Sequence, residues 1–241
     1  MEKIITYENL RCFTYSNDRL IKGEVQGIVL SFLGLGFSDM IKDDPAVAVE
    51  YAERGVIYLI PYYNPWCWMN RNTVAYVDEI VGVLCAHYGL HTPKIVSTGV
   101  SMGGLCALVY CAYATVTPVR CVTNCPVCDL VYHFDEREDL PRTLYSAFLG
   151  YGGTMEEALS SASPVYLASK MPRIPYTVFH CEADAAVNIE RHSVRFVEAM
   201  RPYANVTLVR VPARGHGDLS EEAKAEYKKQ ILGAFFKEET C

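Results

Sequence analysis

The chain has 241 residues, of which 51% are hydrophobic and 21% charged, with a formal net charge of -6 at pH 7. This size suits a single domain, 1–241, with a sizeable core, and the composition excludes a disordered chain, a collagen-like repeat and a small disulfide scaffold. The acidic balance offers no field that attracts phosphate backbones, so we expect no nucleic-acid partner.

Short apolar runs alternate with amphipathic segments along most of the chain. Each run is rich in β-branched residues and is bounded by glycine or proline, which is typical of parallel strands joined by helical crossovers. The predicted strands are 27–33, 56–60, 94–98, 120–123, 176–180 and 206–211. The predicted helices are 44–54, 73–88, 103–115, 187–201 and 219–236. The alternation predicts an α/β domain with a mostly parallel sheet.

Two stretches depart from this alternation. Near the N-terminus, 4–14 and 20–25 flank a turn-forming Ser-Asn-Asp at 16–18, which predicts an antiparallel hairpin leading into the first parallel strand. At about 124–170, charged and glycine-rich segments interrupt the pattern, and Thr154 begins a segment with a plausible helix cap. We expect a small, cap-like helical insertion there rather than a second domain.

The chain shows no targeting or membrane signal. It begins without a basic stretch and apolar core, and it contains no run of about 18 apolar residues, so we expect a cytoplasmic protein without membrane contact. There the ten cysteines should be reduced and mostly buried. Cys125 and Cys128 are spaced like a dithiol redox motif, but no second pair accompanies them as in a zinc site. We therefore favour no metal and leave the role of this pair open.

Gly99-Val-Ser101-Met-Gly103 follows the strand 94–98 and opens the helix 103–115. This is the strand, sharp turn and helix context of a nucleophile elbow. The turn forces strained backbone on the serine, and small residues two positions to either side let strand and helix approach closely. A serine hydroxyl also needs a base and a carboxylate, so this prediction depends on finding both further along the chain.

Both partners follow in the chain order serine, aspartate, histidine. Asp184 follows the strand 176–180 and precedes a helix, and His216 lies between glycines just after the last strand. The chain has six histidines, and His216 is the one on a glycine-lined loop after the final strand. Asp218 and Glu182 are rival carboxylates, but the Asp-x-x-Val pattern entering a helix favours Asp184. We predict a catalytic triad of Ser101, Asp184 and His216.

These motifs together resemble the α/β-hydrolase superfamily. The Gly-x-Ser-x-Gly-Gly elbow, Ser163-Pro164, the run His180-x-x-x-Asp184-x-x-Val and the Gly-His-Gly loop are most similar to prolyl oligopeptidase-type catalytic domains and their stand-alone esterase relatives. The resemblance extends over about 20–236. It implies an α/β-hydrolase fold with a mostly parallel twisted sheet, helices on both faces, and a serine hydrolase that needs no organic cofactor. The chain departs from the family with Leu33 for a histidine and Cys181 for a glycine.

The resemblance also implies an oxyanion hole made of two backbone amides. One belongs to the residue after the nucleophile, which is Met102. The other comes from the loop after the first parallel strand, where the place in Leu33-Gly34-Leu35-Gly36 indicates Leu35. Backbone donors tolerate any side chain, so the missing histidine at position 33 need not abolish the hole. An ordinary glycine turn is the alternative interpretation.

The loop 61–70 contains two prolines and several large side chains, including both tryptophans of the chain, and it follows a strand. Aromatic residues usually pack in cores, but a loop cannot bury all of this surface against a sheet. We therefore predict that the loop is a wall of the substrate pocket. The candidate substrate-binding residues are Tyr62, Tyr63, Trp66 and Trp68.

Three functions remain open. The first is hydrolysis of carboxylic esters of small molecules through an acyl-enzyme, and the lack of an N-terminal propeller favours it. The second is cleavage of peptides or amides, as in the larger relatives of the resembled family. The third is a non-catalytic binding module on the same fold, which the presence of all three triad candidates disfavours. Homo-oligomer formation also remains possible.

Overall fold

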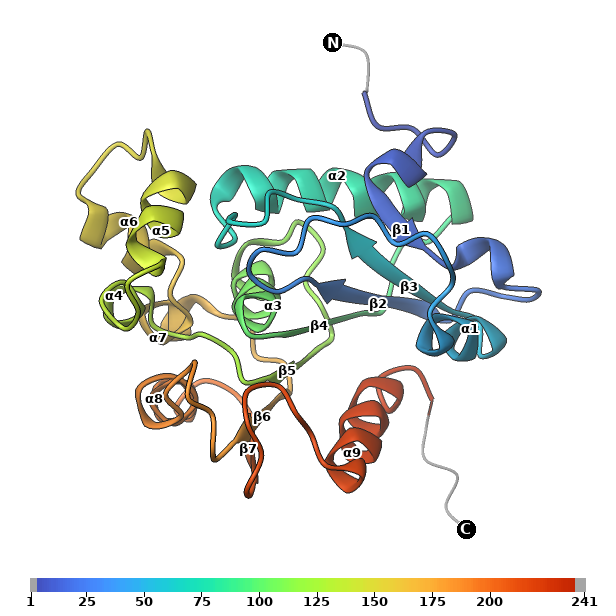
Figure 1. Ribbon diagram of the computed structural model, residues 1–241. Helices are drawn as coiled ribbons and strands as arrows, with labels where there is room; N and C mark the ends of the chain where they lie inside the picture. Colours follow the sequence, from blue (N-terminus) through green and yellow to red (C-terminus); the bar gives the residue numbers. More distant parts are fainter. Residues whose placement is uncertain (1–3, 237–241) are drawn as a thin grey trace.

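The structure is a computed structural model that describes residues 4–236. Its centre is a seven-stranded sheet in the order β1-β3-β2-β4-β5-β6-β7, in which β1 runs antiparallel to β3 and all other neighbours are parallel (Figure 1). The strands are β1 Thr14–Ser16, β2 Gly27–Phe32, β3 Val56–Pro61, β4 Ile95–Val100, β5 Arg120–Asn124, β6 Tyr176–Cys181 and β7 Val206–Val211. The six predicted parallel strands are confirmed to within two residues at each end.

Helices cover both faces of the sheet (Figure 1). The larger elements are α1 Ala46–Glu53, α2 Arg71–Tyr88, α3 Met102–Tyr113, α8 Arg195–Met200 and α9 Glu221–Leu232, with a π-helix, η4 Glu190–Val194, running into α8. Buried residues of α2, α3 and α8 share one core cluster, and residues of α1 and α9 pack on the opposite face. The mostly parallel sheet between two helical layers confirms the predicted fold class.

Local signals explain the bounds of α2. The Asn70 side chain accepts a hydrogen bond from the Thr73 N–H at 3.0 Å, which caps the first turn. Gly89 ends the helix with a φ of 64°, a left-handed conformation that favours glycine. The helix therefore begins and ends at residues whose types are readable in the sequence.

The predicted N-terminal hairpin is wrong in its pairing. β1 pairs with β3 rather than with residues 20–25, and the short 3-10 helices η1 Leu10–Cys12 and η2 Asp18–Leu20 flank it. The reason lies in Asn17. Its buried side chain donates to the carbonyl of Ala48 at 2.6 Å and accepts from the Tyr58 N–H at 2.7 Å. These bonds attach the turn to α1 and β3, so residues 20–25 are left outside the sheet.

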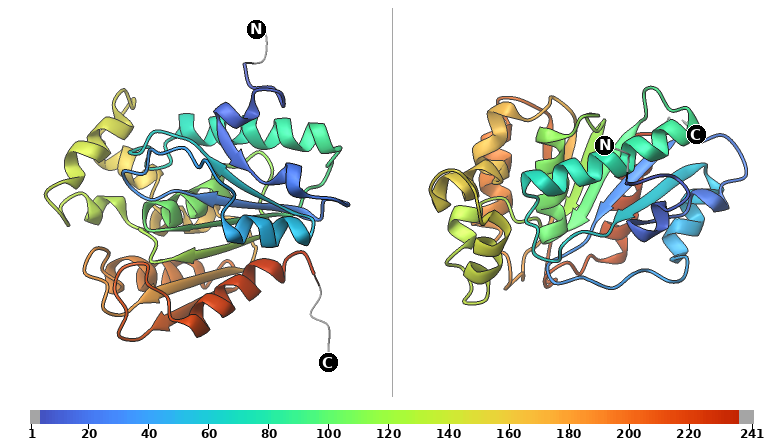
Figure 2. Two further views of the ribbon diagram at one scale, coloured as in Figure 1. Left: turned by 45° about the vertical axis from the view of Figure 1, so that its right-hand side comes forward. Right: turned by 90° about the horizontal axis from the view of Figure 1, so that it is seen from above.

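Four short helices lie between β5 and β6, where the sequence predicts an insertion. They are α4 Leu130–His133, α5 Leu140–Phe148, α6 Met155–Ser161 and α7 Pro164–Leu167, followed by the 3-10 helix η3 Ala168–Lys170. Thr154 and Glu157 form the capping box that starts α6. Both views of Figure 2 show α4 to α6 grouped at one side of the molecule. Within residues 4–236, no helix is long and apolar enough to cross a membrane.

Cysteines mostly fill the core. Of the nine in the described residues, all are free thiols and most are buried, whereas Cys241 lies outside those residues. Cys125 packs on the α1 and α9 face of the sheet and Cys128 on the α2 and α3 face. The two sulfurs therefore do not face each other as a dithiol redox pair would.

Candidate active site

Ser101 lies at a sharp turn between β4 and α3. Its backbone has a φ of 60° and a ψ of -125°, a strained conformation for a residue with a side chain. The glycines on either side are required by close contacts. A Cβ on Gly99 would lie 2.3 Å from the Gly103 carbonyl oxygen, and a Cβ on Gly103 would lie 2.2 Å from that of Phe32. The spacing of small residues thus has the steric reason that the sequence suggests.

Asp184 and His216 meet at the same edge of the sheet. Asp184 follows β6 and His216 follows β7, and the His216 Nδ1 lies 2.7 Å from the Asp184 Oδ2. The other carboxylate oxygen accepts N–H groups of Ala186 at 2.8 Å and Val187 at 3.0 Å. The carboxylate is 1% exposed and the imidazole 30% exposed. This arrangement holds the carboxylate firmly and leaves the imidazole edge open to a reacting group.

The rival carboxylates have other partners. Asp218 pairs with Arg214 at 3.1 Å, and Glu182 lies 3.9 Å from Arg210. Both are solvent-exposed ion pairs. Of the three carboxylates considered from the sequence, Asp184 is the one hydrogen-bonded to His216.

Asn124 joins the elbow to the histidine loop, and sequence reasoning missed it. Its carbonyl accepts the N–H of Ser101 at 3.0 Å, while its side-chain amide donates to the Gly217 carbonyl at 2.9 Å. Gly217 lies close to the end of β4, because a Cβ on it would be 3.1 Å from Val100. A polar residue at the end of β5, the strand between β4 and β6, was the available signal.

The loop after β2 lies against the start of α3. A Cβ on Gly103 would come within 2.9 Å of the Leu33 carbonyl oxygen, so this loop and the Met102 amide occupy one corner of the site. Met102 begins α3, and an amide at that position has no acceptor within the helix. The Tyr63 hydroxyl donates to the Leu33 carbonyl at 2.9 Å, and the Gly36 N–H donates to Pro65 at 3.1 Å. The loop 61–70 is thus hydrogen-bonded to the segment that contains Leu35.

The four aromatic candidates of this loop have different surroundings. Trp68 is fully buried, and its Nε1–H donates to the Thr143 hydroxyl at 3.0 Å, so the prediction that it lines a substrate pocket is wrong. The insertion covers this tryptophan from α5, a contact between segments far apart in the chain. Trp66 is half-buried with the Arg142 guanidinium 4.9 Å from its ring centre. Tyr62 and Tyr63 border a cavity of about 380 Å³.

Comparison with known proteins assigns the fold to a family. The family model described as the prolyl oligopeptidase family matches residues 68–240. The chain belongs to the prolyl oligopeptidase family. This is a family of hydrolases, and its α/β-hydrolase fold agrees with the sheet and elbow described above. No curated protein matches the chain closely enough to count as a relative.

Solved structures show the same fold. A puromycin hydrolase has a TM-score of 0.70 at 18% identity and covers 89% of this chain and 35% of its own. The acylaminoacyl peptidase of Pyrococcus horikoshii has a TM-score of 0.68 at 12% identity, with coverages of 89% and 37%. A thermophilic esterase of Thermogutta terrifontis has a TM-score of 0.65 at 20% identity, with coverages of 95% and 90%. The chain thus spans about a third of the length of the puromycin hydrolase and of the acylaminoacyl peptidase, but most of the esterase.

The surroundings of Asp184 and His216 favour the charged form of each side chain. Burial disfavours the ionised form of Asp184, but the imidazoles of His180 and His216 and the backbone N–H groups of the following turn outweigh it, so the pKa of its carboxyl lies well below its usual range. The hydrogen bond to Asp184 and contact with the Cys125 thiol raise the pKa of His216 to about 9. In this family member the free site therefore holds a carboxylate beside an imidazolium at neutral pH.

Proposed function

We propose that this chain is a serine hydrolase that cleaves carboxylic esters of small substrates. The observation that supports this most directly is the Asp184–His216 hydrogen bond next to the strained turn of Ser101, with Asn124 bonded to both segments. In this proposal Ser101 Oγ attacks the acyl carbon and His216 takes its proton. The amides of Leu35 and Met102 stabilise the oxyanion, and His216 then returns the proton to the leaving alcohol. Water activated by His216 releases the acyl group.

The proposed substrate pocket lies along the loop 61–70, where Tyr62 and Tyr63 border a cavity together with residues of α2. Three contacts join this loop to the insertion: Trp66 with Arg142, Trp68 with Thr143, and the Asn70 side chain with the Ala147 carbonyl at 2.8 Å. In this arrangement Tyr62, Tyr63 and Trp66 are candidates for contact with substrate, while Trp68 supports the wall from inside. The insertion would then act as a cap that limits substrate size.

Peptide or amide cleavage is the second candidate, because the family is named for prolyl oligopeptidases and one of the similar structures is an acylaminoacyl peptidase. The match to the esterase covers 90% of that esterase's length, and this similarity favours esters. We expect p-nitrophenyl esters of short acyl chains to be hydrolysed with at least a tenfold higher kcat/KM than aminoacyl p-nitroanilides. Steady-state assays with both series decide between the two; a preference for the anilides would overturn the ester proposal.

Covalent labelling separates either enzyme from a binding module. We expect a fluorophosphonate to label the chain once, and a peptide map should find the label on Ser101, because the activated serine forms a stable phosphonate ester. A chain that remains unlabelled, or is labelled elsewhere, would contradict the assignment of Ser101.

The pKa of His216 predicts how activity depends on pH. A general base must be neutral, and with a pKa of about 9 the imidazole is mostly protonated below that pH. We therefore expect kcat/KM for an aryl ester to rise tenfold per pH unit and to level off near pH 9. Because the folded pKa exceeds the ordinary value of 6.5, the ion pair stabilises the fold fully below pH 6.5 and this contribution is lost as the pH rises through 9. Asp184→Asn should move the inflection to lower pH; a wild-type inflection near 6.5 would contradict the prediction.

A further inference from the structure

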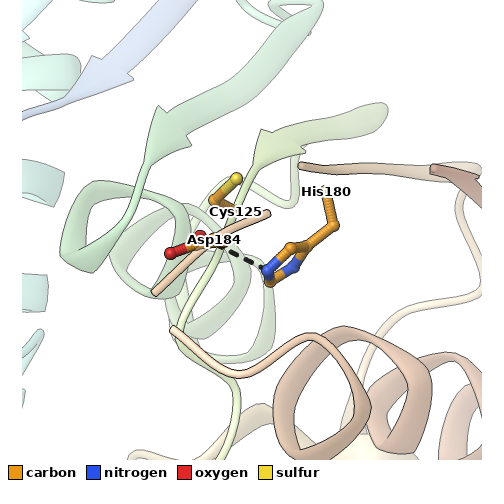
Figure 3. Close-up of side chains that lie close together, drawn as sticks. All are labelled: Cys125, His180 and Asp184. Atoms are coloured by element: carbon orange, nitrogen blue, oxygen red, sulfur yellow. Dashed lines mark ion pairs between the residues drawn. The ribbon is translucent and has the colours of Figure 1, made fainter. Parts of the chain in front are cut away.

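A second cluster of polar side chains lies directly behind the Asp184–His216 pair. Cys125 follows β5 and His180 lies in β6, and Figure 3 shows the imidazole of His180 directed at the Asp184 carboxylate, with Cys125 beside the pair. The His180 Nε2 is 3.4 Å from the Asp184 Oδ2, and one potential ligand atom from each of the three residues lies within 4.8 Å of the others. Cys125 and His180 are fully buried. The proposed reaction assigns no chemical step to either.

We propose that Cys125, His180 and Asp184 form an inhibitory binding site for a zinc ion, with the Val187 carbonyl as fourth ligand. Tetrahedral zinc with nitrogen and oxygen ligands at about 2.1 Å places neighbouring ligand atoms about 3.4 Å apart. The His180 Nε2 lies 3.4 Å from the Asp184 oxygen and 3.1 Å from the Val187 oxygen, so His180 already has about this spacing to two of the other ligands. The Cys125 sulfur lies within 4.8 Å of the His180 and Asp184 ligand atoms, so the thiolate must move closer to them to complete the tetrahedron.

The surroundings of the ligands suit a bound ion. The His180 Nδ1 lies 2.7 Å from the Ser193 hydroxyl, which can either donate or accept. When Ser193 accepts from Nδ1–H, Nε2 presents its lone pair to the metal, which is the usual outer-shell arrangement of a zinc-bound histidine. The Cys125 sulfur receives the N–H groups of Cys181 at 3.3 Å and Gly217 at 3.5 Å, two donors that stabilise a thiolate.

Zinc binding moves two protons in the site. Zinc displaces the thiol proton of Cys125, which leaves to solvent, and the proton of His180 transfers from Nε2 to Nδ1 without leaving the protein. Binding therefore releases the thiol proton and changes no oxidation state. The affinity should rise with pH because the thiol must deprotonate.

The other cluster of potential metal ligands is excluded by the position of a ring proton. It consists of His133, Glu136 and His192. His133 Nδ1 and His192 Nε2 lie 2.6 and 2.9 Å from one oxygen of Glu136. However, the His192 Nδ1 accepts the backbone N–H groups of Cys128 and Asp129, and a backbone N–H can only donate. The proton of neutral His192 is thereby held on Nε2, so this nitrogen has no lone pair for a metal. Zinc should therefore select the cluster at Cys125.

Inhibition follows if the proposed function is correct. A zinc ion on Asp184 offsets the negative charge that stabilises the imidazolium of His216 during acyl transfer. Hydrolysis should therefore fall as the site fills, through a lower kcat. This consequence depends on the proposed function, whereas metal binding itself can be measured without any substrate.

Titration with Zn²⁺ and Co²⁺ tests the site. Calorimetry of the full chain should show one Zn²⁺ bound with release of protons, and Co²⁺ should give a thiolate-to-metal charge-transfer band. Cys125→Ser should abolish the band and weaken Zn²⁺ binding at least tenfold, and His180→Asn should weaken it similarly. Cys128→Ser, a buried thiol on the other face of the sheet, and Cys12→Ser, which removes an exposed thiol, are matched controls that should retain both signals.

The outcomes are separable. A wild-type chain without the charge-transfer band, or binding that survives both ligand variants, overturns the site even if a variant is unstable, because the wild-type spectrum needs no substitution. Binding lost on His192→Gln but retained in Cys125→Ser would assign the metal to the other cluster and also overturn the proposal. Zinc binding with the predicted variants but no esterase activity would support the site and reject the proposed function instead.

Discussion

Ser101→Ala should lower kcat for p-nitrophenyl esters by roughly 10⁴- to 10⁶-fold, because it removes the only atom that attacks the acyl carbon in the proposed mechanism. The residual rate should reflect substrate binding and oxyanion stabilisation alone. KM should change little, since the hydroxyl contributes mainly to the transition state. Steady-state kinetics on small esters, with active-site titration of the wild type, measure the loss.

The control for Ser101→Ala is Ser38→Ala. Ser38 is an exposed serine in the loop after β2, close in sequence to Leu35 but assigned no role. It should retain wild-type kcat, and both variants should keep the thermal unfolding midpoint within a few degrees. A Ser101→Ala enzyme with substantial activity, or a Ser38→Ala enzyme as inactive as it, would reject Ser101 as the nucleophile.

Asp184→Asn should lower kcat by roughly 10⁴-fold while leaving the fold intact. The carboxylate accepts from His216 Nδ1 at 2.7 Å and thereby places the lone pair of the imidazole on Nε2. An amide at this position can donate to Nδ1 instead, which places the proton on the nitrogen that must act as base. It also removes the charge that raises the pKa of His216. The fall in kcat should therefore accompany a lower inflection in the pH profile.

Asp218→Asn and Glu182→Gln are the matched controls for Asp184→Asn. Each removes one rival carboxylate, and both rivals are exposed and paired with arginines rather than with His216. Neither change should alter kcat by more than about twofold, since exposed ion pairs contribute little. If either control lost as much activity as Asp184→Asn, the assignment of the acid would be wrong.

Much of the fold was predictable because its signals are local. The six parallel strands are short β-branched runs, and the elbow glycines are separated by four positions in the sequence, so each pattern lies within one element or one turn. The prediction of an N-terminal hairpin failed because strand pairing depends on partners elsewhere. Asn17 bonds to Ala48 and Tyr58, contacts that span more than thirty residues. No local pattern distinguishes that arrangement from a hairpin.

The site residues also divide into those that local sequence patterns predicted and those that depend on distant contacts. Ser101, Asp184 and His216 each have a recognisable neighbourhood in the sequence, whereas the bridging role of Asn124 exists only where β5 lies between its neighbours. The burial of Trp68 depends on α5, whose Thr143 hydroxyl accepts its indole N–H. The aromatic composition of the loop was readable, but which rings face a pocket was not.

The sequence by itself determined the alternation of strands and helices, the sharp turn at Ser101 and the chain order of the serine, aspartate and histidine. These follow from backbone sterics and from side-chain periodicity, which act over a few residues. Only the tertiary structure decided the pairing of β1 with β3, the burial of Trp68 and the meeting of Cys125, His180 and Asp184 behind the histidine. Each of these depends on contacts between segments distant in the chain, where packing and burial rather than local preference select the arrangement.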